Sequence, residues 1–478
     1  MGSVVKLEPS ANGAPPGAAG NGVASNGVNR NGAARDGAAR DGAARDGAAR
    51  NGAARDGAAR NGVHPRATRI RRGRKRPSRT ALVLGGGGFT GGVYEIGALR
   101  ALDLLAVNST VTDFDVYVGT SAGAFIAALC ANGVTPEEMM QVATSEEPQP
   151  FRDIGLGDLL RLNLSELARK GIQMPLHLAS LAAQVVRHPR QVSVLDVLFG
   201  LAQALPAGLY TGAGIESYLR KLLAEPGRTD DFRELRGGRE LYITATDLDT
   251  CERVVLGAEG FADVPISTAV RASGALPMVY APVKLDGREL VDGGITSTSN
   301  LDIAVEAGAK LVVVINPMVP YVNDFSAEVR TLRGRRPRRV SDMGFPQIGY
   351  QAFKLLGHRR LHELAAYWGE RYPGVDIVLV EPEPTDELMF QTSIMDFASR
   401  IAIARHGFQS VAHHLAQEYD RYLEVAQRHG IEISGERLRT VVEHFDGAEP
   451  GQDAGAWRRI LEGTNGGLRR ASESPAAG

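Results

Sequence analysis

Short apolar runs alternate with helical patterns from residue 80 onward. The strand candidates are the apolar segments at residues 81–84, 114–118, 241–246, 282–285 and 311–315. A helix of small residues is predicted directly after the second of them, over residues 121–132. Because strands that alternate with helices are typical of a parallel sheet covered on both faces, residues 80–318 predict a three-layer α/β/α domain with a mostly parallel sheet.

Helical patterns dominate residues 135–224. They open with a capping box, in which Thr135 precedes Pro136 at the first helical position and Glu138 stands three residues after the threonine. Residues 172–186 carry several leucines and valines. This segment is either a lid or interfacial surface or an ordinary core helix, and the pattern favours the core helix.

The pattern changes again after Pro320. Residues 330–339 predict a basic, proline-containing loop, and long helical patterns follow with one strand candidate at residues 375–380. We interpret residues 319–478 as a helical C-terminal extension that packs on the sheet, and we expect about the last twelve residues to be loose.

A disordered arm is predicted ahead of the domain, over residues 1–79. Residues 29–62 repeat the unit Asn/Asp-Gly-Ala-Ala-Arg, which offers no apolar face and contains a helix-disfavouring glycine each time. The basic run at residues 69–76 is suited to binding anionic lipid, with a binding free energy of about 1 kcal/mol per charge. The alternative is that this run is a solvated linker. No aromatic residues interleave with these charges, so no nucleic-acid partner is expected.

Charge is divided unevenly along the 478 residues. Residues 1–80 carry 16 Lys and Arg against five Asp and Glu, a net charge of +11, and the rest of the chain carries 38 against 50, a net charge of −12. The two cysteines, Cys130 and Cys251, lack the neighbours of a zinc or redox motif. No run approaches the ~20 apolar residues of a membrane-spanning helix, and the N-terminus lacks a secretory signal. A cytoplasmic protein is expected, with peripheral membrane contact through residues 69–79 as a hypothesis.

The strongest chemical signal is Gly119-Thr120-Ser121-Ala122-Gly123, placed where a strand ends and a helix begins. This is the setting of a nucleophile elbow, in which a sharp turn lifts the serine hydroxyl out of the sheet. The flanking residues must be small because side chains there would meet the neighbouring strand and helix. The alternative is a chance match in a chain with 57 glycines, and the strand–turn–helix setting favours the elbow.

A second signal is the glycine run at residues 85–88, which continues through Phe89 and Thr90 to Gly91. Consecutive glycines let the backbone N–H groups of Gly86, Gly87 and Gly88 approach the oxyanion of an acyl-transfer intermediate. The rival interpretation is a dinucleotide loop, because Gly86, Gly88 and Gly91 have its spacing. That motif also requires an acidic residue about 20 residues on, after the next strand, and here that strand leads to the elbow instead. The sequence therefore favours an oxyanion hole.

A third signal is Asp292, which follows a short apolar strand and precedes Gly293 and Gly294. Alone it is weak, since Asp-Gly is commonest as a simple turn. Its position after the other two motifs makes it the candidate partner of Ser121.

These three motifs, in this order, resemble the patatin-like phospholipase family over about residues 81–316. The resemblance includes the segment at residues 273–277, Asn300 and the Gly-Ala stretch at residues 307–309. It implies a Ser121–Asp292 dyad, a glycine-loop oxyanion hole and hydrolysis of lipid acyl esters with neither metal nor cofactor. Two features depart from the family pattern: Thr90 stands where a basic residue is usual, and the spacing from Asp292 to Asn300 is longer.

Histidines are the alternative source of a general base, since an ordinary hydrolase triad runs Ser, Asp, His along the chain. His177 and His188 lie in the helical insert, and the candidates after Asp292 are His358, His362, His406, His413 and His414. His362-Glu363 fails as a zinc-protease motif because Ala366 replaces its second histidine.

The sequence thus predicts a lipid acyl-hydrolase of the phospholipase A, lysophospholipase or esterase type that acts through an acyl-enzyme at Ser121. Two alternatives stay open: an acyltransferase on the same fold, and a non-catalytic, membrane-associated scaffold.

Overall fold

A computed structural model describes residues 4–6, 78–144, 206–323, 334–391 and 399–446, together with residues 325 and 328–331 and a few isolated residues between 161 and 187. The five-residue repeat, the basic run at residues 69–76, His177, His188 and the last residues of the chain lie outside the described residues, as does most of the segment at residues 172–186. The predictions made for these parts stay predictions.

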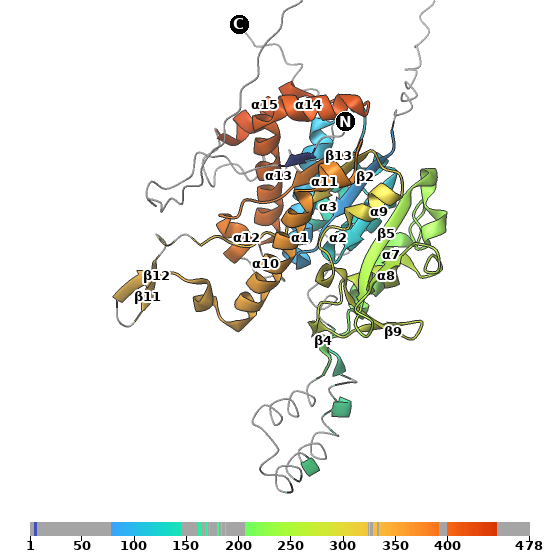
Figure 1. Cartoon of the computed structure of the whole chain (residues 1–478), viewed down its shortest axis with the longest axis vertical. Coiled ribbons are helices and arrows are strands. Elements are labelled where there is room, and N and C mark those ends of the chain that lie inside the picture. Colours follow the sequence, from blue (N-terminus) through green and yellow to red (C-terminus); the bar gives the residue numbers. More distant parts are fainter. Residues whose placement is uncertain are drawn as a thin grey trace, which may run out of the picture. The chain divides into compact units, whose positions relative to one another are not determined.

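The core of the fold is a nine-stranded sheet (Figure 1). Its strands are β1 (Val4–Lys6), β13 (Asp376–Val380), β10 (Leu311–Ile315), β2 (Thr80–Leu84), β3 (Val116–Thr120), β5 (Glu240–Asp247), β9 (Arg288–Asp292) and β8 (Val283–Leu285), in this spatial order, with β6 (Arg253–Leu256) on β5. Neighbours from β1 to β5 run parallel, and β9, β8 and β6 pair antiparallel. The prediction of a mostly parallel sheet is confirmed.

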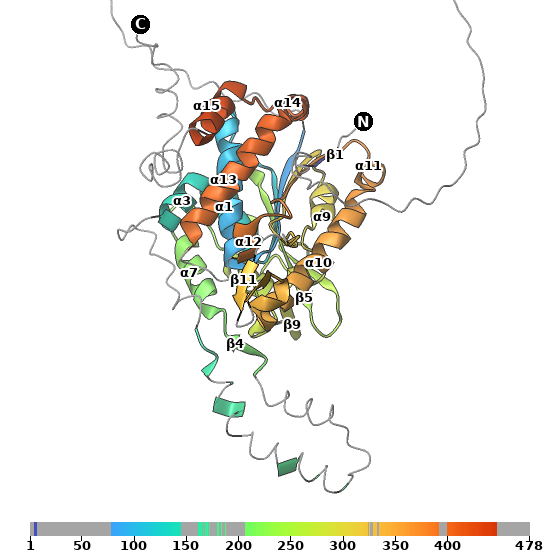
Figure 2. The ribbon, with the colours of Figure 1, turned by 90° about the vertical axis from the view of Figure 1, so that its left-hand side faces the viewer.

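Helices cover both faces of this sheet. Side chains of a strand alternate between faces, and β2 shows the result: Leu82 and Leu84 belong to one apolar cluster, whereas Ala81 and Val83 belong to a second. The first cluster packs under α1 (Gly88–Leu105), α2 (Ala122–Ala131) and α13 (Arg400–Gln417), and the second under α9 (Leu301–Glu306), α10 (Phe345–Ala365) and α11 (Trp368–Arg371). Figure 2 shows α1 and α13 on one side of the strands and α9 and α10 on the other. This is the predicted three-layer α/β/α arrangement.

The C-terminal extension contributes to the sheet as well as to the helical layers. β13 lies between β10 and β1, in register with β10 from Asp376 to Val380. α13 packs along α1, where Tyr94 and Phe408 are both fully buried. The remaining described helices are α3 (Pro136–Thr144), α7 (Ala213–Leu223), α8 (Ile266–Ser273), α12 (Glu387–Gln391), α14 (Tyr419–Arg428) and α15 (Gly435–Asp446). The proposed boundary between residues 318 and 319 therefore falls inside one continuous sheet.

Local signals differ in how well they predicted these elements. The capping box is confirmed, because Thr135 N donates to Glu138 Oε2 at 3.1 Å and Glu138 N donates to Thr135 Oγ1 at 3.2 Å. The loop expected at residues 330–339 is instead largely a hairpin of β11 (Glu328–Thr331) and β12 (Gly334–Pro337). β4 (Gly208–Tyr210), which pairs with β7 (Met278–Tyr280), lies in a region expected to be helical. Such strands are too short to show an alternating pattern.

No helix among the described residues has the length and apolar character that crossing a bilayer requires.

Two truncated proteins should show that the folded domain requires Arg79 but not the residues before position 75. Arg79 donates from Nη1 to the carbonyl of Ala307 at 2.6 Å and pairs with Glu240 at 2.5 Å. Deleting residues 1–74 keeps these contacts and should leave hydrolysis of a soluble short-chain ester within about twofold, because only the three-residue edge strand β1 is lost from the sheet. Deleting residues 1–79 should lower Tm by a further ~2–4 °C, the shift for about 1 kcal/mol in a domain of this class. Equal Tm values for the two truncated proteins would contradict this role of Arg79.

Candidate active site

Ser121 lies in the turn between β3 and α2, with a φ of 56° and a ψ of −123°. Such a positive φ is costly for a residue with a side chain and persists only when the surroundings enforce it. A Cβ on Gly119 would lie 2.5 Å from Ala124 Cα, and a Cβ on Gly123 would lie 2.3 Å from the carbonyl oxygen of Gly85. Both positions therefore exclude any side chain, which is the reason predicted for this motif.

The hydroxyl of Ser121 donates a hydrogen bond from Oγ to Asp292 Oδ2 at 2.5 Å. The two residues are 171 positions apart in the chain and are both buried, with relative exposures of 9% and 3%. Asp292 ends β9, which pairs with β5 so that Asp292 lies opposite Ala245. Its second oxygen, Oδ1, accepts from Gly294 N at 2.8 Å in the short turn that begins at Gly293. This turn holds the carboxylate toward the serine.

Burial raises the pKa of Asp292 to about 6, while the hydrogen bonds from Ser121 and from the Gly294 N–H act in the opposite direction. An ordinary aspartate has a pKa of about 3.9 and is a poor base at neutral pH. A carboxylate with a pKa near 6 is still ionised at neutral pH and accepts a proton more readily. The arrangement can therefore remove a proton from the serine hydroxyl.

The glycine run lies directly beside the serine. A Cβ on Gly86 would lie 3.2 Å from Ser121 Cβ, and α1 begins at Gly88 with Gly87 as its N-cap. Gly91 lies in the first turn of α1 and donates to the carbonyl of Gly87 at 2.9 Å. Within the described residues, no backbone carbonyl accepts from the N–H groups of Gly86, Gly87 or Gly88. Since α2 also begins next to Ser121, two helix N-termini with their partial positive charge adjoin the hydroxyl.

Ser273 was not singled out by the sequence, although it lies in the segment at residues 273–277 that resembles the family. Its Oγ accepts from the backbone N–H of Ser121 at 2.7 Å. It ends α8, and the opposite end of this helix is held by Asp230, which accepts from Ser267 N at 2.6 Å and Ser267 Oγ at 2.7 Å. α8 therefore braces the turn that carries the hydroxyl.

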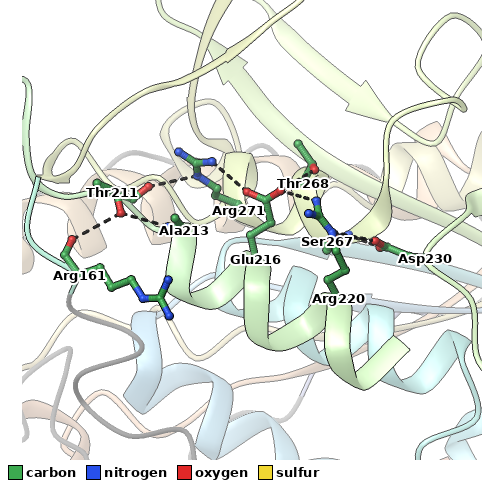
Figure 3. A network of polar contacts seen from close by, with 9 residues as sticks. All are labelled: Arg161, Thr211, Ala213, Glu216, Arg220, Asp230, Ser267, Thr268 and Arg271. Carbon is green, nitrogen blue, oxygen red and sulfur yellow. Dashed lines mark hydrogen bonds and ion pairs between the residues drawn. The ribbon is translucent and has the colours of Figure 1, made fainter. Parts of the chain in front are cut away.

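A polar network ties α8 to α7 (Figure 3). Glu216 of α7 accepts from Arg271 Nη1 at 2.9 Å, from Thr268 Oγ1 at 3.1 Å and from Arg220 Nη2 at 2.6 Å. Burial raises the pKa of Glu216, but the hydrogen bonds and charges of these partners outweigh it and leave the pKa lowered. Glu216 is thus held as an anion that links the two helices behind Ser121.

Asn300 ties together the strands under the elbow. Its Nδ2 donates to Thr120 Oγ1 at 3.0 Å and to Thr244 Oγ1 at 3.1 Å, and its Oδ1 accepts from Arg253 Nη1 at 2.9 Å. Asn300 is fully buried and belongs to the support of the elbow rather than to the pocket.

A pocket opens over the dyad. It is lined by Gly86, Gly87, Gly88, Ser121, Gly274, Leu276, Val279, Tyr280, Asp292, Gly294, Thr298, Met318, Tyr350 and Phe353. Apart from the dyad and the loop, most of these side chains are apolar or aromatic. The pocket is therefore suited to an acyl chain whose ester group reaches the serine.

Part of the pocket wall comes from the C-terminal extension, which sequence reasoning did not connect with the site. Tyr350 and Phe353 lie on α10, and Tyr350 donates from its hydroxyl to the carbonyl of Gly87 at 3.3 Å. The ammonium of Lys354 lies 4.7 Å from the ring centroid of Tyr350, and burial lowers its pKa to about 8. α10 thus brings a buried basic residue beside Tyr350, whose hydroxyl binds the glycine loop.

The histidines considered as general bases have partners away from the dyad. His358 and His362 face Glu381, and His406 pairs with Asp386. His413 and His414 each bond the carbonyl four residues earlier in α13. Among the described residues, none of these five forms a hydrogen bond with Ser121 or Asp292.

His429 takes part in another hydrogen-bonded chain that was not anticipated. Ser78 Oγ lies 2.5 Å from His429 Nδ1, and His429 Nε2 lies 2.7 Å from Asp376 Oδ2. Asp376 begins β13, level with Thr80, whereas Ser121 follows the opposite end of the parallel strands, about 20 Å farther along the sheet. Arg428 also binds Asp376 through two donors, Nε to Oδ2 and Nη2 to Oδ1, both at 3.0 Å. This group closes the amino end of the sheet.

One protein family and one relative match part of the chain. Residues 82–305 match the family model described as patatin-like phospholipase. The "Probable lipid hydrolase 463L" of Invertebrate iridescent virus 6 is 23% identical over 229 residues, which cover 47% of this chain and 63% of that protein. The present chain therefore matches less than two thirds of this relative's length.

Two solved structures also align. VipD from Legionella pneumophila has 13% identity and a TM-score of 0.32, with 84% of this chain and 89% of that one covered. ExoU from Pseudomonas aeruginosa, solved with SpcU, has 16% identity and a TM-score of 0.29, with 72% and 53% covered. Both TM-scores lie below 0.5, so neither structure bears on the assignment of the site.

Proposed function

We propose that this chain, whose residues 82–305 form a patatin-like phospholipase domain, hydrolyses carboxylic esters of lipids through an acyl-enzyme at Ser121. The observation that carries the proposal is the 2.5 Å hydrogen bond from Ser121 Oγ to the buried carboxylate of Asp292, beneath a glycine run and inside a mostly apolar pocket. A nucleophile within reach of its base, with backbone donors nearby, is the minimum an acyl transfer requires.

In the acylation step, Asp292 takes the Ser121 proton as Oγ bonds to the ester carbonyl carbon. The carbonyl oxygen becomes an oxyanion, which the N–H groups of Gly86, Gly87 and Gly88 stabilise. When the intermediate collapses, the bond to the alkoxy oxygen breaks and Asp292 returns the proton to the departing alcohol. The products are a free alcohol, such as a lysolipid, and an ester at Ser121.

The deacylation step repeats this chemistry with water. Asp292 removes a proton from a water molecule as its oxygen attacks the acyl carbon, and the same glycines hold the second oxyanion. The bond to Ser121 Oγ then breaks, the serine recovers its proton from Asp292, and a fatty acid leaves. No residue other than the dyad changes its protonation state.

The two alternatives give different products. An acyltransferase would pass the acyl group to an added alcohol faster than to water, and this is measured by product analysis with and without glycerol. A scaffold would show no turnover and no labelling by a fluorophosphonate. We expect free fatty acid as the main product in both conditions, together with stoichiometric labelling.

The pH profile should reflect the raised pKa of Asp292. Because the base must be ionised, kcat/KM should fall as the pH is lowered, about tenfold per pH unit below an apparent pKa of about 6. An ordinary aspartate would keep the rate level to about pH 4. The measurement uses a soluble ester between pH 4.5 and 8, with circular dichroism at each pH to exclude unfolding. A rate that stays constant down to pH 5 in folded protein would contradict the role of Asp292 as base.

A further inference from the structure

Three potential metal ligands meet outside the pocket. His358 and His362 lie one turn apart on α10, and Glu381 directly follows the end of β13. His362 Nε2 lies 2.7 Å from Glu381 Oε2, and His358 Nε2 lies 4.0 Å from Glu381 Oε1. The two imidazole rings lie side by side, with centroids 4.1 Å apart. Both histidines therefore point a ring nitrogen toward the same carboxylate.

The spacing of these atoms suits a small divalent cation. One ligand atom from each residue lies within 4.8 Å of the other two. Ligands at the 2.0–2.2 Å distances of zinc, in tetrahedral geometry, are about 3.3–3.6 Å apart. The observed distance from His362 to Glu381 is shorter than this separation and that from His358 is longer, so a bound ion would draw His358 closer to the carboxylate and hold His362 farther from it.

A hydrogen bond also fixes the orientation of the Glu381 carboxylate, as is common for carboxylates that bind metal ions. Asn316, which follows β10, donates from Nδ2 to Glu381 Oε1 at 2.7 Å, and such an outer hydrogen bond fixes the direction of a metal-binding carboxylate. Among the described residues, neither Lys nor Arg forms an ion pair with Glu381. The side chains of His358 and His362 are 22% and 36% exposed, so solvent reaches the cluster.

We propose that His358, His362 and Glu381 bind one transition-metal ion of the Zn²⁺ type, with water in the fourth position. Two nitrogens and one carboxylate oxygen match the borderline-soft character of zinc. The sequence predicted no metal because a zinc-protease motif takes its residues from one helix, whereas Glu381 arrives here from the end of a strand. The ion would join α10 to β13 and thereby restrain the helix that carries Tyr350 and Phe353 of the pocket.

Co²⁺ and Zn²⁺ provide the test on the full-length, chelator-treated protein. One equivalent of Co²⁺ should give the visible absorption of a four-coordinate nitrogen and oxygen site, and added Zn²⁺ should abolish it by competition. Zn²⁺ at saturating concentration should also raise Tm, because it binds the folded chain preferentially. The affinity is measured by competition with a chromophoric chelator.

Substitutions identify the ligands. His358→Gln, His362→Gln and Glu381→Gln should each weaken Zn²⁺ binding by roughly tenfold or more and remove the Tm increase. His413→Gln is the matched control, since His413 also lies on a helix but belongs to no such cluster within the described part of the chain, and this variant should bind Zn²⁺ like the unmodified protein. Circular dichroism verifies that each variant is folded, and His362→Gln and Glu381→Gln provide independent tests should His358→Gln misfold. Absence of stoichiometric binding, or equal binding by the control and all ligand variants, would overturn the proposal.

Discussion

Replacing Ser121 by Ala is expected to abolish ester hydrolysis, with a loss of at least about a thousandfold in kcat, and to prevent labelling by a fluorophosphonate. The variant lacks the atom that forms the acyl-enzyme, so background hydrolysis by the pocket alone remains. The fold should be unaffected, because Ser121 lies between glycines and the change removes one hydroxyl without adding volume. Release of fatty acid from a soluble ester and gel detection of the label measure the two effects.

Ser78→Ala is the matched control for this experiment. Ser78 forms a hydrogen bond with His429, and His429 in turn bonds the carboxylate of Asp376, but this group lies at the opposite end of the sheet from Ser121. This variant should keep its activity and its label. A Ser121→Ala protein that retains full activity, or a Ser78→Ala protein that loses it while folded, would show that the nucleophile is misassigned.

Replacing Asp292 by Asn is expected to lower kcat by about a hundredfold or more, the usual effect of losing a general base. The amide is close in shape to the carboxylate and can still accept a hydrogen bond from Ser121, but it cannot take up the proton. Kinetics on one soluble ester measure the loss.

The thermal stability of Asp292→Asn distinguishes a chemical role of Asp292 from a structural one. Burial raises the folded-state pKa of Asp292 to about 6, above the ordinary value of about 3.9. At pH 8 the carboxylate is ionised in both states, and its charge is less favourable in the folded chain; this cost begins to fall as the pH drops through about 6 and is gone only below about 3.9. Asp292→Asn at pH 8 should therefore have a Tm no lower than that of the unmodified protein. A large drop in Tm would mean that the lost activity reflects misfolding.

The histidines provide the comparison that distinguishes a dyad from a triad. Alanine substitutions of His358, His362, His406, His413 and His414, made singly, should each leave most of the activity. His429→Ala should do the same if it is folded, since its partners Ser78 and Asp376 lie away from the pocket. One folded histidine variant as inactive as Asp292→Asn would replace the dyad with a conventional triad.

The sequence by itself determined those elements whose pattern is contained in a few consecutive residues. The strand at residues 311–315 was predicted with its observed bounds, because five consecutive apolar residues on a central parallel strand are buried on both faces. The elbow was also predictable, because its close packing admits no side chain at either glycine: Gly119 lies against the start of the following helix, and Gly123 lies against the end of the neighbouring strand β2. Asp292 was recognised from its order after the other motifs.

Tertiary structure alone decided which distant segments complete the site. Tyr350 and Phe353 carry no local pattern that marks them for the pocket, and they reach it only because α10 packs beside the carboxyl ends of the strands. Ser273 likewise accepts from the Ser121 N–H only because α8 packs beside the elbow. The joining of β13 to β10 and the meeting of Glu381 with His358 likewise depend on how the chain returns to the sheet. Periodicity reports the face that one element buries, whereas these contacts depend on which elements become neighbours, and that choice is made by the packing of the whole core.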